Sequence, residues 1–150
     1  MSSRPSRSGA RAVPGARAPS LSPGDKRRLL AAARRVRAHA HAPYSRFRVG
    51  AAVLDERGVI HVGCNVENAS YGLTVCAERN AVAAAIAAGA RHLRAVAVVT
   101  ATRPPARPCG ACRQVLRERG DDATIVLMAP PAGAPEERRL GDLLPESFSL

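Results

Sequence analysis

The sequence of 150 residues is poor in aromatic side chains, with two Phe, two Tyr and no Trp. It contains no apolar run of about eighteen residues or more, which argues against a transmembrane helix. No apolar h-region follows the first residues, so we expect no secretory signal and a cytoplasmic location. The apolar residues are mainly Ala, Val and Leu, and a chain of this length is most naturally one domain with one core.

Lysine is almost absent, since Lys26 is the single lysine among 23 basic residues, and the formal net charge is +11. A charge of this size can indicate nucleic-acid binding. The first 23 residues contain no acid, however, and the other arginines are scattered, with their highest density in 27–37. Because they form no clear basic channel, we expect no nucleic-acid partner.

Residues 1–21 are rich in Ser, Arg, Pro, Gly and Ala. Prolines at positions 5, 14 and 19 interrupt any helix, and few side chains there could enter a core. The segment is therefore predicted to be a disordered basic tail that precedes one folded domain over 22–150. The same prolines argue against the amphipathic helix of a transit peptide.

The folded part alternates between helical and extended patterns. Ser22 and Pro23 are typical of a helix start, apolar residues then recur at steps of three and four, and Pro43 ends this helix. The rest predicts strands over 47–54 and 59–63, a helix over 75–88 capped by Thr74, a strand over 95–100, a helix over 108–119 starting at Pro108, a strand over 124–129 and one helical turn within 139–145. This order indicates an α/β fold with a mixed sheet covered by helices.

Three of the four cysteines have the spacing of metal ligands. Cys76 is followed two residues later by Glu78, and Cys109 and Cys112 form a C-x-x-C motif after Pro108. In a chain without an export signal, this motif indicates reduced thiols and a metal. Three protein ligands leave one position of a tetrahedral zinc ion open, as in catalytic sites. We therefore predict one zinc ion, held by the three cysteines, and Glu78 as an unligated catalytic acid and base.

Two other interpretations of the cysteines stay open at this point. Cys109 and Cys112 could be a redox pair, because that motif also opens a helix, but this leaves Cys76 and Glu78 unexplained. A closed structural zinc site would need Cys64 as a fourth ligand. Cys64 ends a predicted strand and is interpreted as a core thiol. The four histidines show no ligand spacing with the cysteines.

Several segments in the same order resemble those of small, single-domain cytidine deaminases. They are APYSRFRVGAA at 42–52, GCNVENASY at 63–71, CAERNA at 76–81 and PCGACRQV at 108–115, followed by Leu143-Leu144-Pro145 and Phe148. The resemblance covers most of 24–150. It implies a three-layer α-β-α fold around a mixed five-stranded sheet, and a homotetramer in which neighbouring subunits complete each active site.

The resemblance also implies roles for individual residues. One zinc ion per subunit would be bound by Cys76, Cys109 and Cys112, and Glu78 would shuttle protons. The residues implied to contact the nucleoside are Asn65 and Glu67 at the ribose hydroxyls, Phe47 near the pyrimidine, Ala77, and Tyr71 and Phe148 near a subunit boundary. The implied reaction is hydrolytic deamination of cytidine and 2′-deoxycytidine to uridine and 2′-deoxyuridine, with release of ammonia, in pyrimidine salvage.

Arg79 is predicted to support the metal without binding it. Three thiolates give a zinc site a net charge of about −1, which weakens zinc as a Lewis acid. An arginine three residues after Cys76 could relieve this by donating hydrogen bonds to a thiolate sulfur. The other interpretation of Arg79 is a surface arginine on a helix.

Three further functions would keep part of this pattern. A deaminase of a cytosine-nucleoside antibiotic such as blasticidin S would keep the cysteine motifs, but we would not expect the intact segment Asn65–Asn68. A tRNA or polynucleotide base deaminase usually has His in place of Cys76 and needs a basic channel. A non-enzymatic zinc module with a nucleic-acid-binding tail would make Glu78 dispensable and bring Cys64 to the metal.

Overall fold

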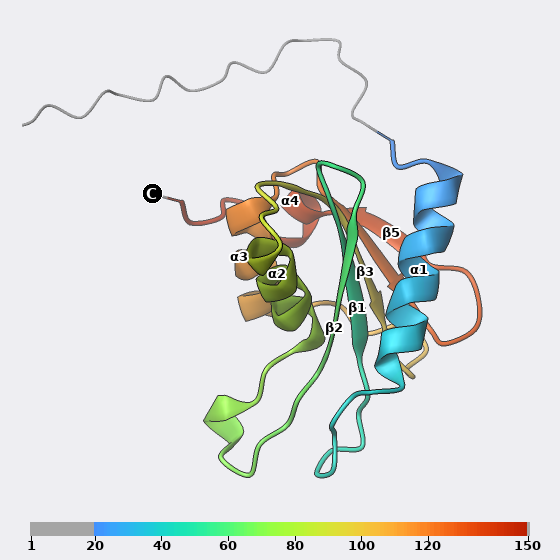
Figure 1. Ribbon diagram of the computed structural model, residues 1–150, viewed down its shortest axis with the longest axis vertical. Helices are drawn as coiled ribbons and strands as arrows, with labels where there is room; N and C mark the ends of the chain where they lie inside the picture. The colour runs from blue at the N-terminus through green and yellow to red at the C-terminus, as the bar shows by residue number, and fades with distance from the viewer. Residues whose placement is uncertain (1–19, 150) are drawn as a thin grey trace, which may run out of the picture.

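A five-stranded mixed sheet is the middle layer of the computed structural model, which describes residues 20–149 (Figure 1). Its order is β2 (Ile60–Cys64), β1 (Gly50–Asp55), β3 (Leu93–Val99), β4 (Ile125–Ala129) and β5 (Glu136–Arg139). β1 pairs antiparallel with β2 and β3, β3 pairs parallel with β4, and β4 pairs antiparallel with β5. The predicted mixed sheet is confirmed.

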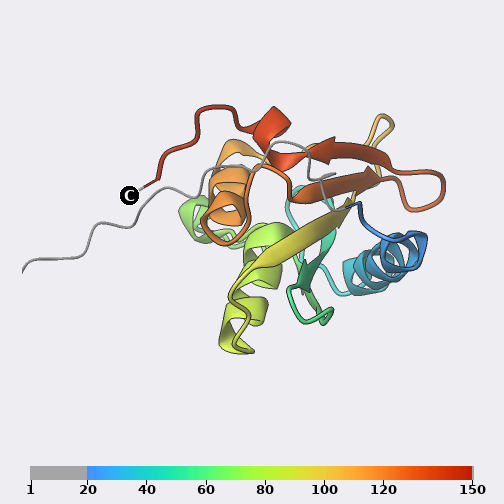
Figure 2. The ribbon, with the colours of Figure 1, turned by 90° about the horizontal axis from the view of Figure 1, so that it is seen from above.

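Helices cover both faces of this sheet (Figures 1 and 2). α1 (Pro23–Arg37) lies on one face, and α2 (Ala77–Ala87) and α3 (Gly110–Arg119) lie on the other. The short helices η1 (Tyr71–Leu73) and α4 (Leu140–Leu143) precede α2 and follow β5. The three-layer α-β-α fold is therefore confirmed. None of the helices within 20–149 is long and apolar enough to span a membrane.

The central strands are buried on both faces because their alternate side chains enter two different cores. Along β1, Ala51 and Val53 face α2 and α3, whereas Ala52 and Leu54 face α1. β3 and β4 divide their side chains in the same way. Small residues dominate both cores, so the helices can lie close to the sheet.

Gly63 in β2 permits the closest of these approaches on the side of α2. A Cβ atom at this position would lie 2.4 Å from the backbone nitrogen of Ala81 and 2.6 Å from the carbonyl oxygen of Ala77. The Asn80 side chain adds a hydrogen bond of 2.9 Å to the carbonyl oxygen of Cys64. These contacts hold the first turn of α2 against the edge strand.

The N-terminal tail predicted over 1–21 lies largely outside the described residues, which begin at Ser20. Leu21, which we had assigned to the tail, is buried at 5% exposure and packs in the core on the side of α1. Packing of the chain therefore begins before the helix N-cap at Ser22, whose side chain accepts a hydrogen bond from the Asp25 backbone.

Several predicted element boundaries were wrong. α1 ends at Arg37, well before Pro43. β1 begins at Gly50, because the Asn65 side chain binds the backbone of Phe47 and Val49 in place of a strand partner. The helices predicted to begin near Thr74 and at Pro108 begin after Cys76 and Cys109, which are their N-cap residues. β5 was absent from the residue pattern and was expected only from the family resemblance.

We expect Gly63→Ala to lower the free energy of unfolding by about 1–3 kcal/mol, because the added methyl group overlaps the α2 backbone. Urea denaturation followed by circular dichroism measures this change. Gly72→Ala is the matched control, since a Cβ atom there meets nothing within 4 Å. Equal stability of the two variants would show that β2 and α2 are not tightly packed at Gly63.

Candidate active site

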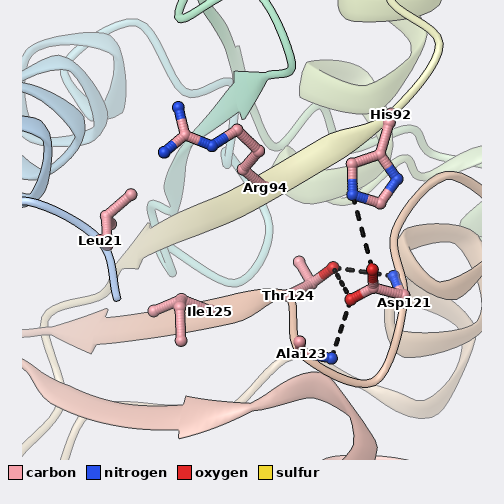
Figure 3. Close-up of a pocket in the computed structure, with 7 residues that line it drawn as sticks. All are labelled: Leu21, His92, Arg94, Asp121, Ala123, Thr124 and Ile125. Atoms are coloured by element: carbon pink, nitrogen blue, oxygen red, sulfur yellow. Dashed lines mark hydrogen bonds and ion pairs between the residues drawn. The ribbon is translucent and has the colours of Figure 1, made fainter. Parts of the chain in front are cut away.

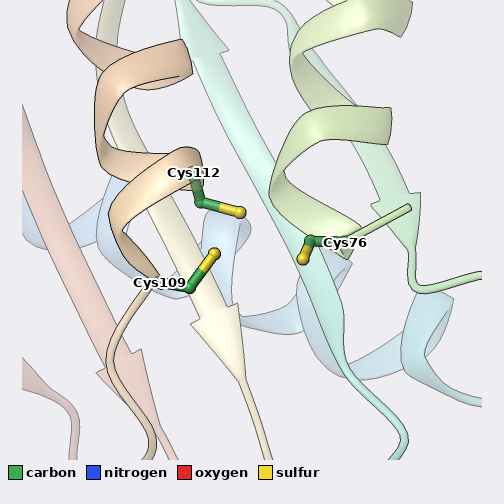
Figure 4. A group of neighbouring side chains, drawn as sticks. All are labelled: Cys76, Cys109 and Cys112. Carbon is green, nitrogen blue, oxygen red and sulfur yellow. The ribbon is translucent and has the colours of Figure 1, made fainter. Parts of the chain in front are cut away.

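Three cysteine sulfurs converge between the N-termini of α2 and α3 (Figure 4). Cys76 is the N-cap of α2, Cys109 is the N-cap of α3, and Cys112 lies in the first turn of α3. Neither N-cap side chain bonds a backbone N–H group of its own helix, and both thiols point into the space between the helices. Both helix ends offer partial positive charge to this space, which favours thiolate over thiol.

The sulfur positions fit a zinc ion. All three sulfur atoms lie within 4.8 Å of one another. Zn–S bonds of about 2.3 Å in a tetrahedral site require sulfurs about 3.8 Å apart, so small side-chain rotations close the remaining gap. Three thiols at one point are also a donor set typical of zinc. Among the described residues, Cys64 does not belong to this group, so an ion held by the three sulfurs would keep a position for a small molecule.

Neighbouring groups prepare Cys76 to act as a thiolate. A hydrogen bond from Cys112, together with the Arg79 guanidinium, lowers the pKa of the Cys76 thiol to about 5, although burial opposes the shift. Arg79 Nη2 lies 3.7 Å from the Cys76 sulfur and 3.1 Å from the carbonyl oxygen of Thr74. The pKa of Cys112 is raised, because its thiol keeps the proton shared with Cys76 and is itself buried.

Glu78 lies beside the thiols and does not join the metal group. It belongs to the first turn of α2 and is only 5% exposed. Burial raises the pKa of its carboxyl group, and the charge of Cys76 adds to this effect. A carboxyl group with a raised pKa can both accept and return a proton near neutral pH.

Glu78 and two of the cysteines line a cavity of about 250 Å³. Its volume is near the lower end for small-molecule sites, which range from about 300 to 1,000 Å³. Four of the residues predicted to contact the nucleoside also line it: Phe47, Asn65, Glu67 and Ala77. The cavity therefore brings together two of the three candidate metal ligands, the buried acid and the predicted sugar-binding pair.

Tyr71 and Phe148 do not line this cavity. Their exposed fractions are 79% and 70%, and the Tyr71 ring lies edge-on to Tyr44 with 6.3 Å between the ring centroids. Phe148 follows α4 on a segment that α3 holds, where Gln114 donates a hydrogen bond of 3.1 Å to the Phe148 carbonyl oxygen. Within a single chain, neither ring reaches the site.

Other cavity-lining residues were not predicted from the sequence. They are Ser45, Val49, Thr74, Val98, Thr100, Ala106 and Arg107. Val98 and Thr100 could have been expected from their position at the carboxyl end of a strand that leads toward the cysteine motif. The others lie on loops, where local patterns give little indication of which way a side chain points.

A second, smaller hollow of about 50 Å³ lies at the opposite end of the sheet (Figure 3). It is lined by Leu21, His92, Arg94, Asp121, Ala123, Thr124 and Ile125. The Thr124 hydroxyl donates to the carbonyl oxygen of Leu93, and His92 Nε2 lies 3.7 Å from Asp121 Oδ2. We interpret it as a packing defect below the N-terminal segment.

Comparison with known proteins agrees with this geometry. Residues 23–128 match the family model of the cytidine and deoxycytidylate deaminase zinc-binding region. The chain is 45% identical over 125 residues to the cytidine deaminase of Sporosarcina psychrophila, covering 83% of this chain and 92% of the relative. It is 50% identical over 113 residues to that of Mycobacterium tuberculosis, covering 75% and 81%.

A solved structure shares the fold as well as the sequence. The crystal structure of cytidine deaminase from Burkholderia pseudomallei superimposes with a TM-score of 0.78 at 48% identity, over 81% of this chain and 98% of that one. The chain therefore belongs to the zinc-dependent cytidine deaminase family of hydrolases.

Proposed function

We propose that the enzyme deaminates both cytidine and 2′-deoxycytidine, giving the corresponding uridine nucleosides and ammonia. The observation that carries this proposal is the buried carboxyl group of Glu78 next to three converging thiols in one cavity. Cys76, Cys109 and Cys112 would hold a zinc ion, which would supply the Lewis acidity that makes water a nucleophile near neutral pH. Side chains of the protein carry out the remaining steps.

Glu78 is the proton carrier. It accepts a proton from the water that attacks C4 of the pyrimidine and donates it to ring N3. A second proton passes by the same carboxyl group to the amino group, which leaves as ammonia while the C4 carbonyl forms. The raised pKa of Glu78 suits this double role, because a strongly acidic carboxyl group would return its proton poorly. Arg79 holds Cys76 and offsets part of the thiolate charge.

Phe47 and the pair Asn65 and Glu67 are assigned to the nucleoside. Phe47 is 38% exposed and lines the cavity, so its ring can stack on a pyrimidine. Asn65 uses its oxygen for the Val49 N–H and one N–H for the Phe47 carbonyl oxygen, at 2.8 Å each. One donor and one acceptor position of its amide remain for a ligand.

Glu67 has even less free capacity. Its carboxylate accepts hydrogen bonds from the backbone N–H groups of Tyr44 and Ser45, at 2.9 and 3.2 Å, and from the Ser45 hydroxyl. A carboxylate has about four acceptor positions, so one remains. We assign it to the 3′-hydroxyl, the one that ribose and 2′-deoxyribose share.

Glu78→Gln is expected to lower kcat for cytidine by about 10²–10⁴-fold, because the amide cannot carry the proton. The ultraviolet change of cytidine measures turnover, and metal analysis measures zinc, which we expect to be retained. Glu118→Gln, at an exposed carboxylate on α3, is the matched control. Unchanged turnover would remove Glu78 from the mechanism, and loss of zinc would make it a ligand.

We expect kcat/KM for cytidine and 2′-deoxycytidine to differ by no more than about tenfold, since the 2′-hydroxyl adds at most one neutral hydrogen bond of about 0.5–1.5 kcal/mol. 3′-Deoxycytidine should lose more, because Glu67 is then left without its ligand. Competition assays with the three nucleosides measure the ratios. The assignment of Glu67 is wrong if 3′-deoxycytidine is the better substrate of the two deoxynucleosides.

We also propose a homotetramer in which Tyr71 and Phe148 complete the site of a neighbouring subunit. The support is the exposure of both rings, together with that of Leu73 at 66%, and the contact of the Tyr71 ring with Tyr44, which precedes the cavity-lining residue Ser45. Gln114 and Arg117 of α3 fix the segment that carries Phe148, so its ring is presented outward on a defined support.

Light scattering should give a particle mass of about four times the 15.7 kDa chain. Phe148→Ala should raise KM several-fold, because the ring contacts substrate in the neighbouring subunit, whereas Val59→Ala at another exposed apolar position should not. A fully active monomer would contradict the shared site.

The cellular setting is part of the proposal. All four cysteines are free thiols, which suits a reducing compartment such as the cytoplasm. In that compartment the reaction would convert free cytidine and 2′-deoxycytidine into uridine and 2′-deoxyuridine, which is a step of pyrimidine salvage.

A further inference from the structure

The Ser45 hydroxyl lies between two groups that we assign to the nucleoside. It donates a hydrogen bond to Oε1 of Glu67 and accepts one of 3.0 Å from the Phe47 backbone N–H. The segment 44–49, which we call the rim, carries both Ser45 and Phe47 and lines the cavity together with Glu67. One side chain thus joins the sugar-binding carboxylate to the backbone of the aromatic residue.

We propose that Ser45 is a positioning residue that sets nucleoside affinity by fixing the direction of the Glu67 carboxylate and the place of Phe47. This inference rests on the proposed role of Glu67 at the sugar. Ser45 itself does not need to touch the substrate. It acts by occupying one acceptor position of Oε1, so that the remaining position of that oxygen points to one place in the cavity.

The main chain of Glu67 is held independently of Ser45. The Glu67 N–H donates to the His41 carbonyl oxygen at 2.8 Å, and the adjacent Val66 forms bridges to His41 and Val75. Removal of the Ser45 hydroxyl would therefore leave the backbone and the two rim N–H bonds to Oε2 in place, and would release Oε1 from the contact that sets its direction. The same hydroxyl helps to keep the pKa of Glu67 below its usual value, together with the two rim N–H groups and against a smaller effect of burial.

The backbone conformation of the rim is a second reason why hydrogen bonds are needed at this point. Arg46, between Ser45 and Phe47, has φ of +58°, in the left-handed region that a residue with a Cβ rarely adopts. Such a conformation persists only where neighbouring contacts impose it. Here they are the Arg46 N–H bond to the Ala42 carbonyl oxygen, the Glu67 bonds to Tyr44 and Ser45, and the Ser45 bond to Phe47.

A purely structural role for Ser45 would have a different signature. Ser45 is exposed and belongs to neither hydrophobic core, so Ser45→Ala leaves no cavity and should barely change the melting temperature. Ser22→Ala provides the contrast, because Ser22 caps α1 far from the cavity and should lower the melting temperature without a change in KM.

The test compares kcat and KM for cytidine in the wild type, Ser45→Ala, Ser45→Thr, Glu67→Gln and the double variant of Ser45→Ala with Glu67→Gln. Calorimetric titration with uridine, the reaction product, reports affinity without turnover. For Ser45→Ala we expect KM and the uridine Kd to rise about five- to tenfold, with kcat changed less than about twofold, because the Glu67 carboxylate loses its charge-assisted bond at Oε1 and the Phe47 N–H loses its bond to the hydroxyl, whereas Glu78 and the cysteines are unchanged. Ser45→Thr keeps a hydroxyl and should restore most of the affinity.

The double variant decides whether Ser45 acts through Glu67. Once Glu67 is changed, Ser45→Ala should add less than about twofold to KM, since coupled residues are not additive. Full additivity, or a normal KM and uridine Kd for Ser45→Ala beside an active wild type, would overturn the inference alone. A wild type that neither converts cytidine nor binds uridine would instead overturn the proposed function on which it rests.

Discussion

The chemistry of this enzyme depends on two helices that begin at the same point in space. Cys76 and Cys109 are the residues at which α2 and α3 start, and Cys112 lies in the first turn of α3. This arrangement gathers three sulfurs within 4.8 Å and surrounds them with unpaired backbone N–H groups, whose partial positive charge stabilises thiolates. Because Glu78 lies only two residues after Cys76, the same helix start that supplies a ligand also buries the acid next to it. The sheet sets where this point lies: Gly63 and the bond from Asn80 to Cys64 hold α2 on β2, and Arg113 holds the loop before α3 through the Pro108 carbonyl oxygen at 2.8 Å.

Residue spacing was sufficient to predict the metal group, and alternating patterns were sufficient for most of the sheet and its helices. The start of α2 was misplaced because Thr74 is a good N-cap by type, whereas in the structure its hydroxyl accepts the Asn68 N–H. Cysteine is not an ordinary cap, so a helix that starts at a candidate metal ligand breaks the local rule where a function is proposed. β5 could not be found from its sequence, Glu-Glu-Arg-Arg, since it has no apolar alternation and forms only by pairing with β4. The contacts of Asn65 and Glu67 with the rim could not be predicted from local sequence patterns either, because they join residues 16 to 23 positions apart.

The floor and the rim of the cavity are built on different principles. The floor consists of Cys76, Cys109 and Glu78 at the starts of helices α2 and α3, so its geometry is fixed by the packing of these helices. The rim is a loop between α1 and β1 whose one residue in the hydrophobic core is Val49, and hydrogen bonds to Asn65 and Glu67 hold it in place. A mutation in the core would therefore disturb the chemical step through the position of α2, whereas a mutation in the rim would disturb binding.

This difference bears on how the enzyme can recognise a sugar at all. Asn65 and Glu67 point their polar atoms at their own rim first and retain only a few positions for a ligand. These existing hydrogen bonds leave fewer positions for the sugar, which lowers the affinity. They also restrain both side chains before binding, so less conformational entropy is lost when the sugar binds. With one open acceptor position, Glu67 can distinguish a hydroxyl group from a hydrogen atom at the 3′-carbon of the sugar. It has no acceptor position left with which to make the same distinction at the 2′-carbon. The tolerance for ribose and deoxyribose that we propose is thus a consequence of how the rim is held.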